Sequence, residues 1–509
     1  MNGRRIEHRA ARITLVNGLS TVLTLAFQLV SVPVCLKYWG KDSYGTWLAL
    51  LSAFLMLRAL DGGFVAFVGN KLNYLYHKDT AALREHLASA SIGIVIIGAI
   101  QLLLAASSLM FSSVAASLGM PSGSTDSMAT QLGLVTLMLS WVLTGSYLGI
   151  VHRLLIPAGL MYEAAWWAMS FQVMQFAAII ASAVLRLGML QTSALFAFSQ
   201  VVIYAASALY VRRALPAYFP WLSGAKARTG LIDLGHSTML TASNIVQQST
   251  TNGAVLLLSA LAGPAVVPVF TTVRTLTNLW TSLTTILTSP LLPEVVRIHA
   301  HGELHKLAAI NQAFWVLAGA TINLGALLFY PLMPLLYRLW TAHAVVLSTP
   351  LLALLLASVV VTNSGALIAL YLNGINKLRI GLATSVGRAA LGLGGGALGF
   401  PFFGIASFGF GILAGEIVAV AIMGRYFARH ELGENGVFLP GAAIAAVTLS
   451  TGAAVLFFVG AALCWWSIGA SWFAALACVV GATIWGWKGL DPELKMRLLS
   501  LITRWRPLA

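Results

Sequence analysis

Long runs of apolar residues separated by short polar segments make up most of the chain. A helix needs about 20 mainly apolar residues to cross the hydrocarbon core of a bilayer, and the runs reach that length. The pattern therefore predicts an all-α polytopic membrane protein with about 14 transmembrane helices. The predicted spans are 13–36, 43–67, 88–111, 129–151, 162–185, 190–211, 237–260, 265–291, 308–330, 346–371, 379–400, 404–427, 440–463 and 467–487.

Lys and Arg residues concentrate on one side of these spans. With the N-terminus inside, the two tails and the inward loops carry 23 of the 30 Lys and Arg residues, and three lie within spans. The outward loops carry the remaining four, which are Lys37, Lys41, Arg186 and Arg338. Cytoplasmic loops of membrane proteins are enriched in basic residues. The asymmetry therefore supports the predicted order of spans and places both termini in the cytoplasm.

Composition excludes several classes of protein. Hydrophobic residues make up 59% of the chain and charged residues 9%, with a mean hydropathy of +0.87. Soluble domains carry about a quarter charged residues, so an ordinary soluble enzyme and a disordered chain are both excluded. The formal charge of +15 follows from the basic inward loops, and no nucleic-acid partner is predicted.

The loops are too short to hold a soluble catalytic domain; the longest run over about 68–87, 112–128 and 212–236. No G-x-x-x-x-G-K-[ST] loop occurs, which argues against an ATP-driven pump within the chain. Three histidines, His299, His301 and His305, have a spacing that could suit a metal, but a solvated loop is the preferred interpretation. We predict a protein that is not an enzyme and has no cofactor.

Five ionisable side chains lie within the predicted spans, where charge is costly and commonly functional. They are Arg58, Asp61, Arg274, Arg388 and Glu416. Arg58 and Asp61 are three residues apart on one helical face and can pair. Arg388 and Glu416 are each 14 residues from position 402, the middle of the turn between their helices. They should therefore lie at the same depth and can also pair.

The predicted pairs have two interpretations, as structural ties or as parts of a binding or coupling site. Arg274 has no acidic residue at a comparable position, which makes it a candidate for contacting an anionic ligand. Amides in the span 237–260 form a polar stripe at helical spacing; the candidates for binding are Asn244, Gln247, Gln248 and Asn252. Such a stripe can hold helices together or line a wet cavity.

The C-terminal residues predict a further helix. Asp491-Pro492-Glu493 is typical of a helix start. Beyond it, apolar residues gather on one face among basic residues, as in helices that lie on a membrane surface. We therefore expect residues 488–509 to form a cytoplasmic interfacial amphipathic helix, or less favourably a helix that docks a partner.

Several short motifs resemble those of one transporter family. Tyr38-Trp39-Gly40, Tyr44-Gly45-Thr46-Trp47 and Leu60-Asp61-Gly62-Gly63 are similar to the opening segment of bacterial polysaccharide (O-antigen, Wzx-type) flippases. The resemblance extends to Leu291-Leu292-Pro293-Glu294, Leu372-Asn373-Gly374 and Gly404-Ile405-Ala406, and it covers roughly 13–430. This family is part of the multidrug/oligosaccharidyl-lipid/polysaccharide (MOP) exporter superfamily, with the lipid II flippases and the multidrug extruders.

The resemblance implies two six-helix lobes with pseudo-two-fold symmetry. It assigns spans 1–6 to an N-lobe (1–231) and spans 7–12 to a C-lobe (232–430). Two additional spans (431–487), as in the lipid II flippases, would precede the interfacial segment. It also implies a bacterial inner-membrane location. The lipid II flippases resemble this chain in their arginines at the places of Arg58 and Arg274. They also have further arginines on the first helix, which this chain lacks apart from Arg12 at the membrane edge.

The function implied is flipping of a polyprenyl-pyrophosphate-linked oligosaccharide, an O-antigen or exopolysaccharide repeat unit, by alternating access. Arg58, Arg274 and Arg388 would hold the anionic head group, and the amide stripe would meet sugar hydroxyls. Asp61 or Glu416 could carry a proton or sodium ion. A polysaccharide polymerase and a chain-length regulator are candidate partners besides the bilayer and the substrate. A multidrug or cation exporter and a lipid II-type flippase are the alternatives.

Overall fold

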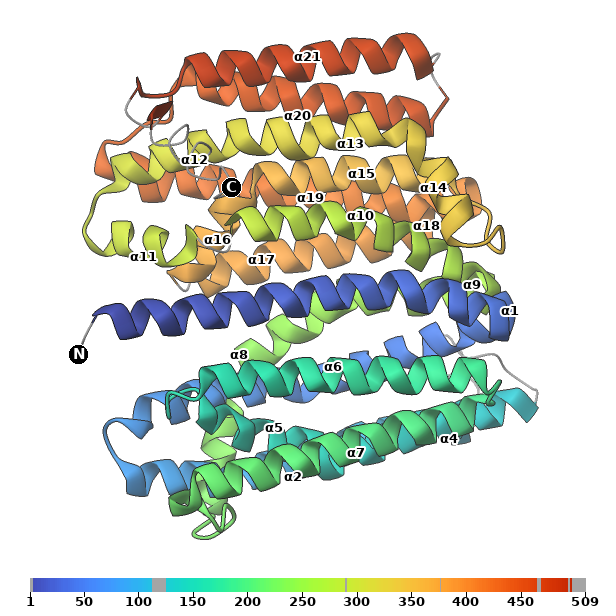
Figure 1. Cartoon of the computed structure of the whole chain (residues 1–509), viewed down its shortest axis with the longest axis vertical. Helices are drawn as coiled ribbons and strands as arrows, with labels where there is room; N and C mark the ends of the chain where they lie inside the picture. Colours follow the sequence, from blue (N-terminus) through green and yellow to red (C-terminus); the bar gives the residue numbers. More distant parts are fainter. Residues whose placement is uncertain are drawn as a thin grey trace, which may run out of the picture. The chain divides into compact units, whose positions relative to one another are not determined.

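The computed structural model describes residues 3–111, 125–288, 291–375, 377–464, 468–492 and 495–496, and every regular element in these ranges is helical (Figure 1). The chain divides into two compact units. The first unit comprises Met1–Val269 with Trp340–Val345, and the second comprises Phe270–Leu339 with Val346–Ala509. This division groups residues by their contacts, so the lobes expected from the internal repeat stay a prediction.

The first unit contains the helices that position the site described below. They are α1 (Gly3–Tyr76), α2 (Thr80–Met110), α4 (Thr125–Ser140), the π-helical turn η1 (Trp141–Gly145), α5 (Ser146–His152), the short 3₁₀ turn η2 (Arg153–Leu155), α6 (Met161–Val184), α7 (Met189–Ala214), α8 (Ala227–Gln248), the π-helical turn η4 (Ser249–Gly253) and α9 (Ala254–Ala262). α1 holds two helical segments, because Gly40 breaks the helical backbone with φ 76° and ψ 179°.

The second unit repeats the pattern of long helices interrupted by short turns. Its main helices are α10 (Val267–Thr288, which begins in the first unit), α11 (Leu292–Ala300), α12 (Leu304–Ala318), α13 (Leu324–Phe329), α14 (Met333–Trp340), α15 (Thr349–Ser364), α16 (Ala366–Gly374), α17 (Leu378–Ala389), α18 (Gly395–Phe403), α19 (Ala406–Tyr426), α20 (Gly441–Ala462) and α21 (Ile468–Lys488). Within this unit α15 packs against α19 and α20, and α20 packs against α21 (Figure 1).

Helices occupy all fourteen predicted spans, so the all-α multi-pass fold class is confirmed. Among the described residues, nine helices are long and apolar enough to cross a membrane, or ten with the bent pair α15 and α16. One of the nine, Val22–Tyr76, covers two predicted spans because it includes the Gly40 break. The remaining predicted spans coincide with α8–α9, α10 and α17–α18, which are shorter, less apolar or interrupted. Most of the predicted interfacial segment 488–509 lies outside the described residues.

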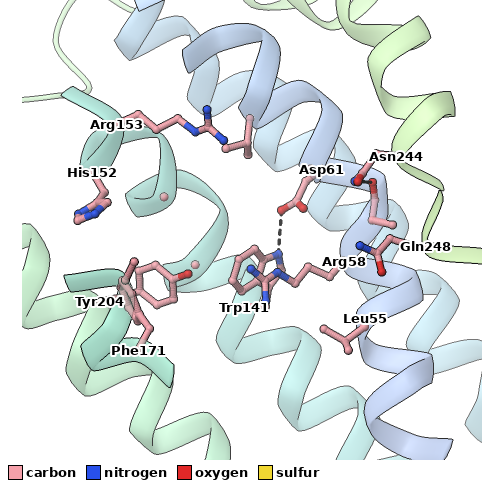
Figure 2. Close-up of a pocket in the computed structure, with 16 residues that line it drawn as sticks. Leu55, Arg58, Asp61, Trp141, His152, Arg153, Phe171, Tyr204, Asn244 and Gln248 are labelled. Atoms are coloured by element: carbon pink, nitrogen blue, oxygen red, sulfur yellow. Dashed lines mark hydrogen bonds between the residues drawn. The ribbon is translucent and has the colours of Figure 1, made fainter. Parts of the chain in front are cut away.

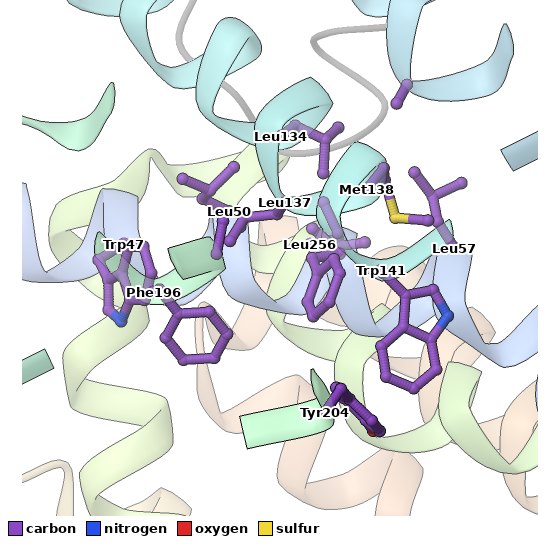
Figure 3. Close-up of a cluster of buried hydrophobic side chains, with 14 residues drawn as sticks. Trp47, Leu50, Leu57, Leu134, Leu137, Met138, Trp141, Phe196, Tyr204 and Leu256 are labelled. Atoms are coloured by element: carbon purple, nitrogen blue, oxygen red, sulfur yellow. The ribbon is translucent and has the colours of Figure 1, made fainter. Parts of the chain in front are cut away.

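Two buried clusters fix the second segment of α1. The first joins Trp47, Leu50 and Phe54 to Trp141 and Phe196 of the neighbouring elements (Figure 3). The second begins about three turns beyond Phe54 with Phe64, Val68 and Leu72, which pack on apolar residues of α2 and α5. Close packing of this kind is the main force that holds transmembrane helices together. The stretch between the clusters, 58–63, is therefore held firmly, and it carries the charged side chains of Arg58 and Asp61.

α8 crosses α1 at the glycine pair of the Leu60-Asp61-Gly62-Gly63 motif. A Cβ atom on Gly63 would lie 2.2 Å from the backbone nitrogen of Thr241, and one on Gly62 would lie 2.2 Å from Nδ2 of Asn244. Only residues without a side chain permit this approach of two backbones. The motif thereby brings the polar side of α8 against the charged turn of α1.

Candidate functional site

A cavity of about 570 Å³ opens beside this crossing, and all its lining residues belong to the first unit (Figure 2). The wall combines charged side chains from α1 and η2, aromatic rings from η1, α6 and α7, and amides from α8. We call it the Arg58 cavity. The residues that matter for its chemistry are Arg58, Asp61, Trp141, His152, Arg153, Phe171, Tyr204, Asn244 and Gln248.

Arg58 is positioned by an aromatic ring. Its guanidinium carbon lies 3.8 Å from the centre of the Trp141 ring. Figure 2 shows the Arg58 and Trp141 side chains together in the wall of the cavity. Trp141 is held by edge contacts with Phe54 and Tyr204, at centroid distances of 6.4 and 5.8 Å. A guanidinium stacked on an indole face gains cation–π energy while its N–H groups remain free to face a ligand. The sequence did not indicate this ring as the partner of Arg58.

Asp61 uses one carboxylate oxygen for two hydrogen bonds. Trp141 Nε1 donates to Oδ2 over 2.8 Å, and the hydroxyl of Ser146 donates to the same atom. The side chain is buried, and the other oxygen, Oδ1, has no hydrogen-bond partner within the described residues. The ion pairs found in those residues do not include Arg58 with Asp61, although the two share one face of α1. The indole of Trp141 lies between them as their common partner.

A second arginine lines the cavity. Arg153 opens the 3₁₀ turn η2, and its side chain lies against Gly69 of α1, where a Cβ atom would lie 2.4 Å from Arg153 Cδ. Next to it, His152 Nδ1 lies 2.9 Å from the hydroxyl of Ser207. By sequence, Arg153 is one of the 23 basic residues of the tails and inward loops, where a basic residue is expected for topology alone. Gly69 is the one feature of the sequence that indicates this position, because a glycine there leaves the space that the Arg153 side chain occupies.

The amide stripe contributes two of its four candidates. Asn244 and Gln248 line the cavity, and Asn244 donates from Nδ2 to the carbonyl oxygen of Ala59 over 2.9 Å. Gln247 is exposed and does not line the cavity. Asn252 donates to Oε1 of Gln248 over 2.8 Å and does not line it either. The π-helical turn η4 (Ser249–Gly253) begins directly after Gln248 and shifts the helical phase, which explains why the stripe does not continue.

The other three candidates lie in the second unit. Arg388 Nε lies 2.9 Å from Oε1 of Glu416, so the pair predicted from equal depth is present as an ion pair. Its hydrogen-bond alignment is poor, since Arg388 Nε has no aligned acceptor. The guanidinium carbon of Arg274, on α10, lies 6.0 Å from the ring centre of Phe270. None of these three side chains lines the Arg58 cavity.

A separate polar cluster joins three helices of the first unit. Asp233 of α8 has a fully buried side chain, and its two oxygens lie 2.7 Å from Lys71 Nζ and 2.7 Å from His86 Nδ1. This cluster ties α8 to α1 and α2. Throughout the described residues, no group of three or more His, Cys, Asp or Glu is placed to hold a metal ion. His299 instead lies 2.9 Å from the hydroxyl of Tyr371.

No family model matches the chain, and no curated protein matches it. Solved structures do match. The lipid II flippase MurJ in an inward closed conformation is 11% identical, with a TM-score of 0.64 over 92% of this chain and 97% of that one. An inward-facing multidrug resistance MATE transporter of the MOP superfamily is 14% identical, with a TM-score of 0.60 over 79% and 93%.

A third match is a MOP superfamily transporter from Pyrococcus furiosus, described as having a binding pocket of reversed polarity. It is 14% identical, with a TM-score of 0.53 over 82% of this chain and 94% of that one. At these identities the likeness concerns the fold. The chain is thus a multi-pass membrane protein with the fold of the MOP superfamily transporters.

Proposed function

We propose that the chain is a flippase that moves a polyprenyl-pyrophosphate-linked oligosaccharide from the cytoplasmic to the periplasmic leaflet of a bacterial inner membrane by alternating access. The observation that carries the proposal is the charge of the Arg58 cavity. Among the described residues, two arginines, Arg58 and Arg153, and a single acid, Asp61, line it. A pyrophosphate cannot cross hydrocarbon unaided, because removing its charges from water costs too much free energy. A cationic, water-accessible cavity removes much of that cost.

The two arginines suit phosphate oxygens in different ways. Arg58 is stacked on Trp141, which leaves the fork of the guanidinium able to make two parallel hydrogen bonds to one phosphate. Arg153 adds a second charge from η2. A hydrogen bond to a charged group contributes about 1.5–3 kcal/mol. Loss of one arginine should therefore weaken pyrophosphate binding by a factor of about 10 to 100.

The amides and aromatic rings suit the first sugars. Asn244 and Gln248 present hydrogen-bonding groups on one side of the cavity, and the rings of Phe171 and Tyr204, 4.3 Å apart, form another wall. Amides bond to hydroxyls as both donors and acceptors. Sugar rings also pack their C–H faces on aromatic surfaces. This combination favours a glycosylated pyrophosphate over a free phosphate.

The net positive charge of the Arg58 cavity also bears on the energy that drives transport and on which class of cargo the cavity suits. A net positive cavity moved across a potential of 100 mV changes free energy by about 2.3 kcal/mol per charge, so an inside-negative potential can return the empty cavity to the inside. Asp61 could also take up a proton or sodium ion. Export of cationic drugs, the alternative for this fold, calls for acids in excess of arginines, which the Arg58 cavity lacks.

The test is the glycolipid profile of cells that lack the protein. The cells are complemented with wild type, with Arg58→Gln, or with Arg212→Gln. Arg212 is a matched control, since it also stacks on a ring, Phe219 at 4.3 Å, but lies outside the cavity. We expect polyprenyl-pyrophosphate oligosaccharide to accumulate in the deletion strain, and wild type and the control to relieve it. Normal glycolipids with new sensitivity to cationic drugs would contradict the proposal and favour an exporter.

A further inference from the structure

A second hollow lies in the first unit at the Gly40 break. It measures about 470 Å³, and we call it the Gly40 hollow. Two aromatic side chains precede the break, an acid follows it, and an arginine from the α6–α7 connection completes the wall; these residues are Tyr38, Trp39, Asp42 and Arg186. Hydroxyl groups of Ser43 and Thr46 add to the lining.

Gly40 produces this arrangement. Its positive φ of 76° belongs to the region that glycine adopts without a steric penalty. The first helical segment of α1 ends there and the second begins, so residues on either side of the break need not follow one helical surface. Tyr38 and Trp39 consequently share one hollow with Asp42.

Thr46 Oγ1 donates to the backbone oxygen of Asp42 over 2.9 Å, but the described charged side chains of the hollow are not paired with each other. Asp42 and Arg186 are both exposed, and among the described residues no ion pair joins them. Trp39 Nε1 is buried and has no hydrogen-bond partner in the described part of the chain. Aromatic faces beside a carboxylate and a guanidinium are groups that suit the C–H faces and hydroxyls of a neutral sugar.

The Gly40 hollow and the Arg58 cavity lie along the same helical segment of α1. Asp42 and Arg58 lie on the same helical segment of α1, sixteen residues apart. At 1.5 Å per residue this is about 24 Å along the helix. The predicted topology places residues 37–42 and Arg186 on the outward side of the membrane. A glycan with its pyrophosphate at Arg58 has to extend over this distance to place its distal sugars in the hollow.

We propose that the Gly40 hollow is a sugar-binding subsite, which takes the distal, uncharged sugars of the translocated glycan on the outward side. This inference rests on the proposed function for the identity of the cargo. Its chemistry is distinct from that of the Arg58 cavity: the hollow takes hydroxyl groups and sugar faces, whereas the cavity takes pyrophosphate. The two sites can therefore be tested with separate probes on the same protein.

The experiment uses the full chain in nanodiscs and two sets of soluble probes. Neutral oligosaccharides (chitotetraose, maltotetraose and a mannotetraose) are tested by saturation-transfer difference NMR, which detects millimolar binding. Inorganic pyrophosphate is tested by calorimetry. The variants are Asp42→Asn, Trp39→Phe and Arg186→Gln in the hollow, and Arg58→Gln in the cavity. Lys41→Gln is the control, because Lys41 neighbours the hollow without lining it.

We expect at least one neutral oligosaccharide to bind wild type. Its affinity should fall about tenfold or more in Asp42→Asn and Arg186→Gln, as for loss of one good hydrogen bond to a charged group, and by less in Trp39→Phe, which keeps an aromatic ring. Pyrophosphate binding should be kept in all three. Arg58→Gln should weaken pyrophosphate binding and keep oligosaccharide binding. Lys41→Gln should bind both probes as wild type does. Absence of oligosaccharide binding to wild type, or binding that the hollow variants leave unchanged, would overturn the subsite. If wild type binds an oligosaccharide but does not bind pyrophosphate, the result would count against the proposed function and not against the subsite.

Discussion

The crossing of α1 and α8 makes a quantitative prediction for Gly63→Ala. The added Cβ would lie 2.2 Å from Thr241 N and 2.3 Å from Thr241 Cα, whereas ordinary contacts begin at 3.4 Å. Both obstructing atoms belong to the backbone, so no side-chain rotation relieves the clash. The two helices must separate by about 1 Å. Overpacking of a tight contact costs about 1–3 kcal/mol, and a backbone clash belongs at the upper end.

The same displacement should impair the site. Asn244 lies one turn beyond Thr241 and donates to the carbonyl oxygen of Ala59 over 2.9 Å. Moving α8 away by about 1 Å lengthens that bond beyond hydrogen-bonding range. Gly63→Ala should therefore lower both thermal stability and pyrophosphate affinity. A substitution that only destabilises the fold would lower thermal stability but would leave pyrophosphate affinity unchanged, when the affinity is measured at a temperature where the protein is folded.

The assay is thermal loss of the monodisperse size-exclusion peak in detergent, followed by calorimetry with pyrophosphate on the folded fraction. Gly235→Ala is the matched control, because Gly235 lies on α8 itself and a Cβ there meets nothing within 4 Å. That control should be unchanged or more stable by up to about 1 kcal/mol, as for glycine to alanine in a helix. Equal stability of the two variants would refute the close crossing.

Three further substitutions test other contacts. Asp233→Asn removes the charge that Lys71 faces at 2.7 Å and should destabilise the protein by up to about 3 kcal/mol, seen as a lower melting temperature that Lys71→Gln partly restores. Arg388→Gln and Glu416→Gln should couple by about 0.5–3 kcal/mol in a double-mutant cycle of thermal stability; strict additivity would contradict their pairing. Trp141→Phe keeps a ring under the guanidinium but loses the indole donor, so transport should fall partly, less than in the arginine variants, when initial rates are compared.

Hydrophobic patterning predicted the helices because each span must satisfy its backbone hydrogen bonds internally, which leaves apolar runs of nearly constant length. The depth argument for Arg388 and Glu416 succeeded for a related reason. Two helices joined by a tight turn bring residues at equal distances from the turn to the same level. The turn falls at Gly404, with φ 54°, two residues beyond the expected midpoint, so Arg388 and Glu416 lie 16 and 12 residues from it and still form an ion pair.

The details of the Arg58 cavity could not be predicted in this way. Pairing of Arg58 with Asp61 was inferred from spacing within one helix, but Trp141, from a different helix, provides the contact for both. Two π-helical turns, Trp141–Gly145 and Ser249–Gly253, alter helical phase, and periodicity alone does not reveal them. Arg153 was assigned to a loop because a basic residue after a span is expected on topological grounds.

The most direct test of a cationic cavity that carries a lipid-linked glycan is transport by the purified protein. Proteoliposomes are loaded with a fluorescent polyprenyl-pyrophosphate oligosaccharide, and its movement between leaflets is followed by accessibility to an added quencher. We predict that wild type and Arg212→Gln flip the lipid, and that Arg58→Gln flips it about 10 to 100 times more slowly at sub-saturating substrate. Flipping by Arg58→Gln at the wild-type rate, or no flipping by wild type, would contradict the account.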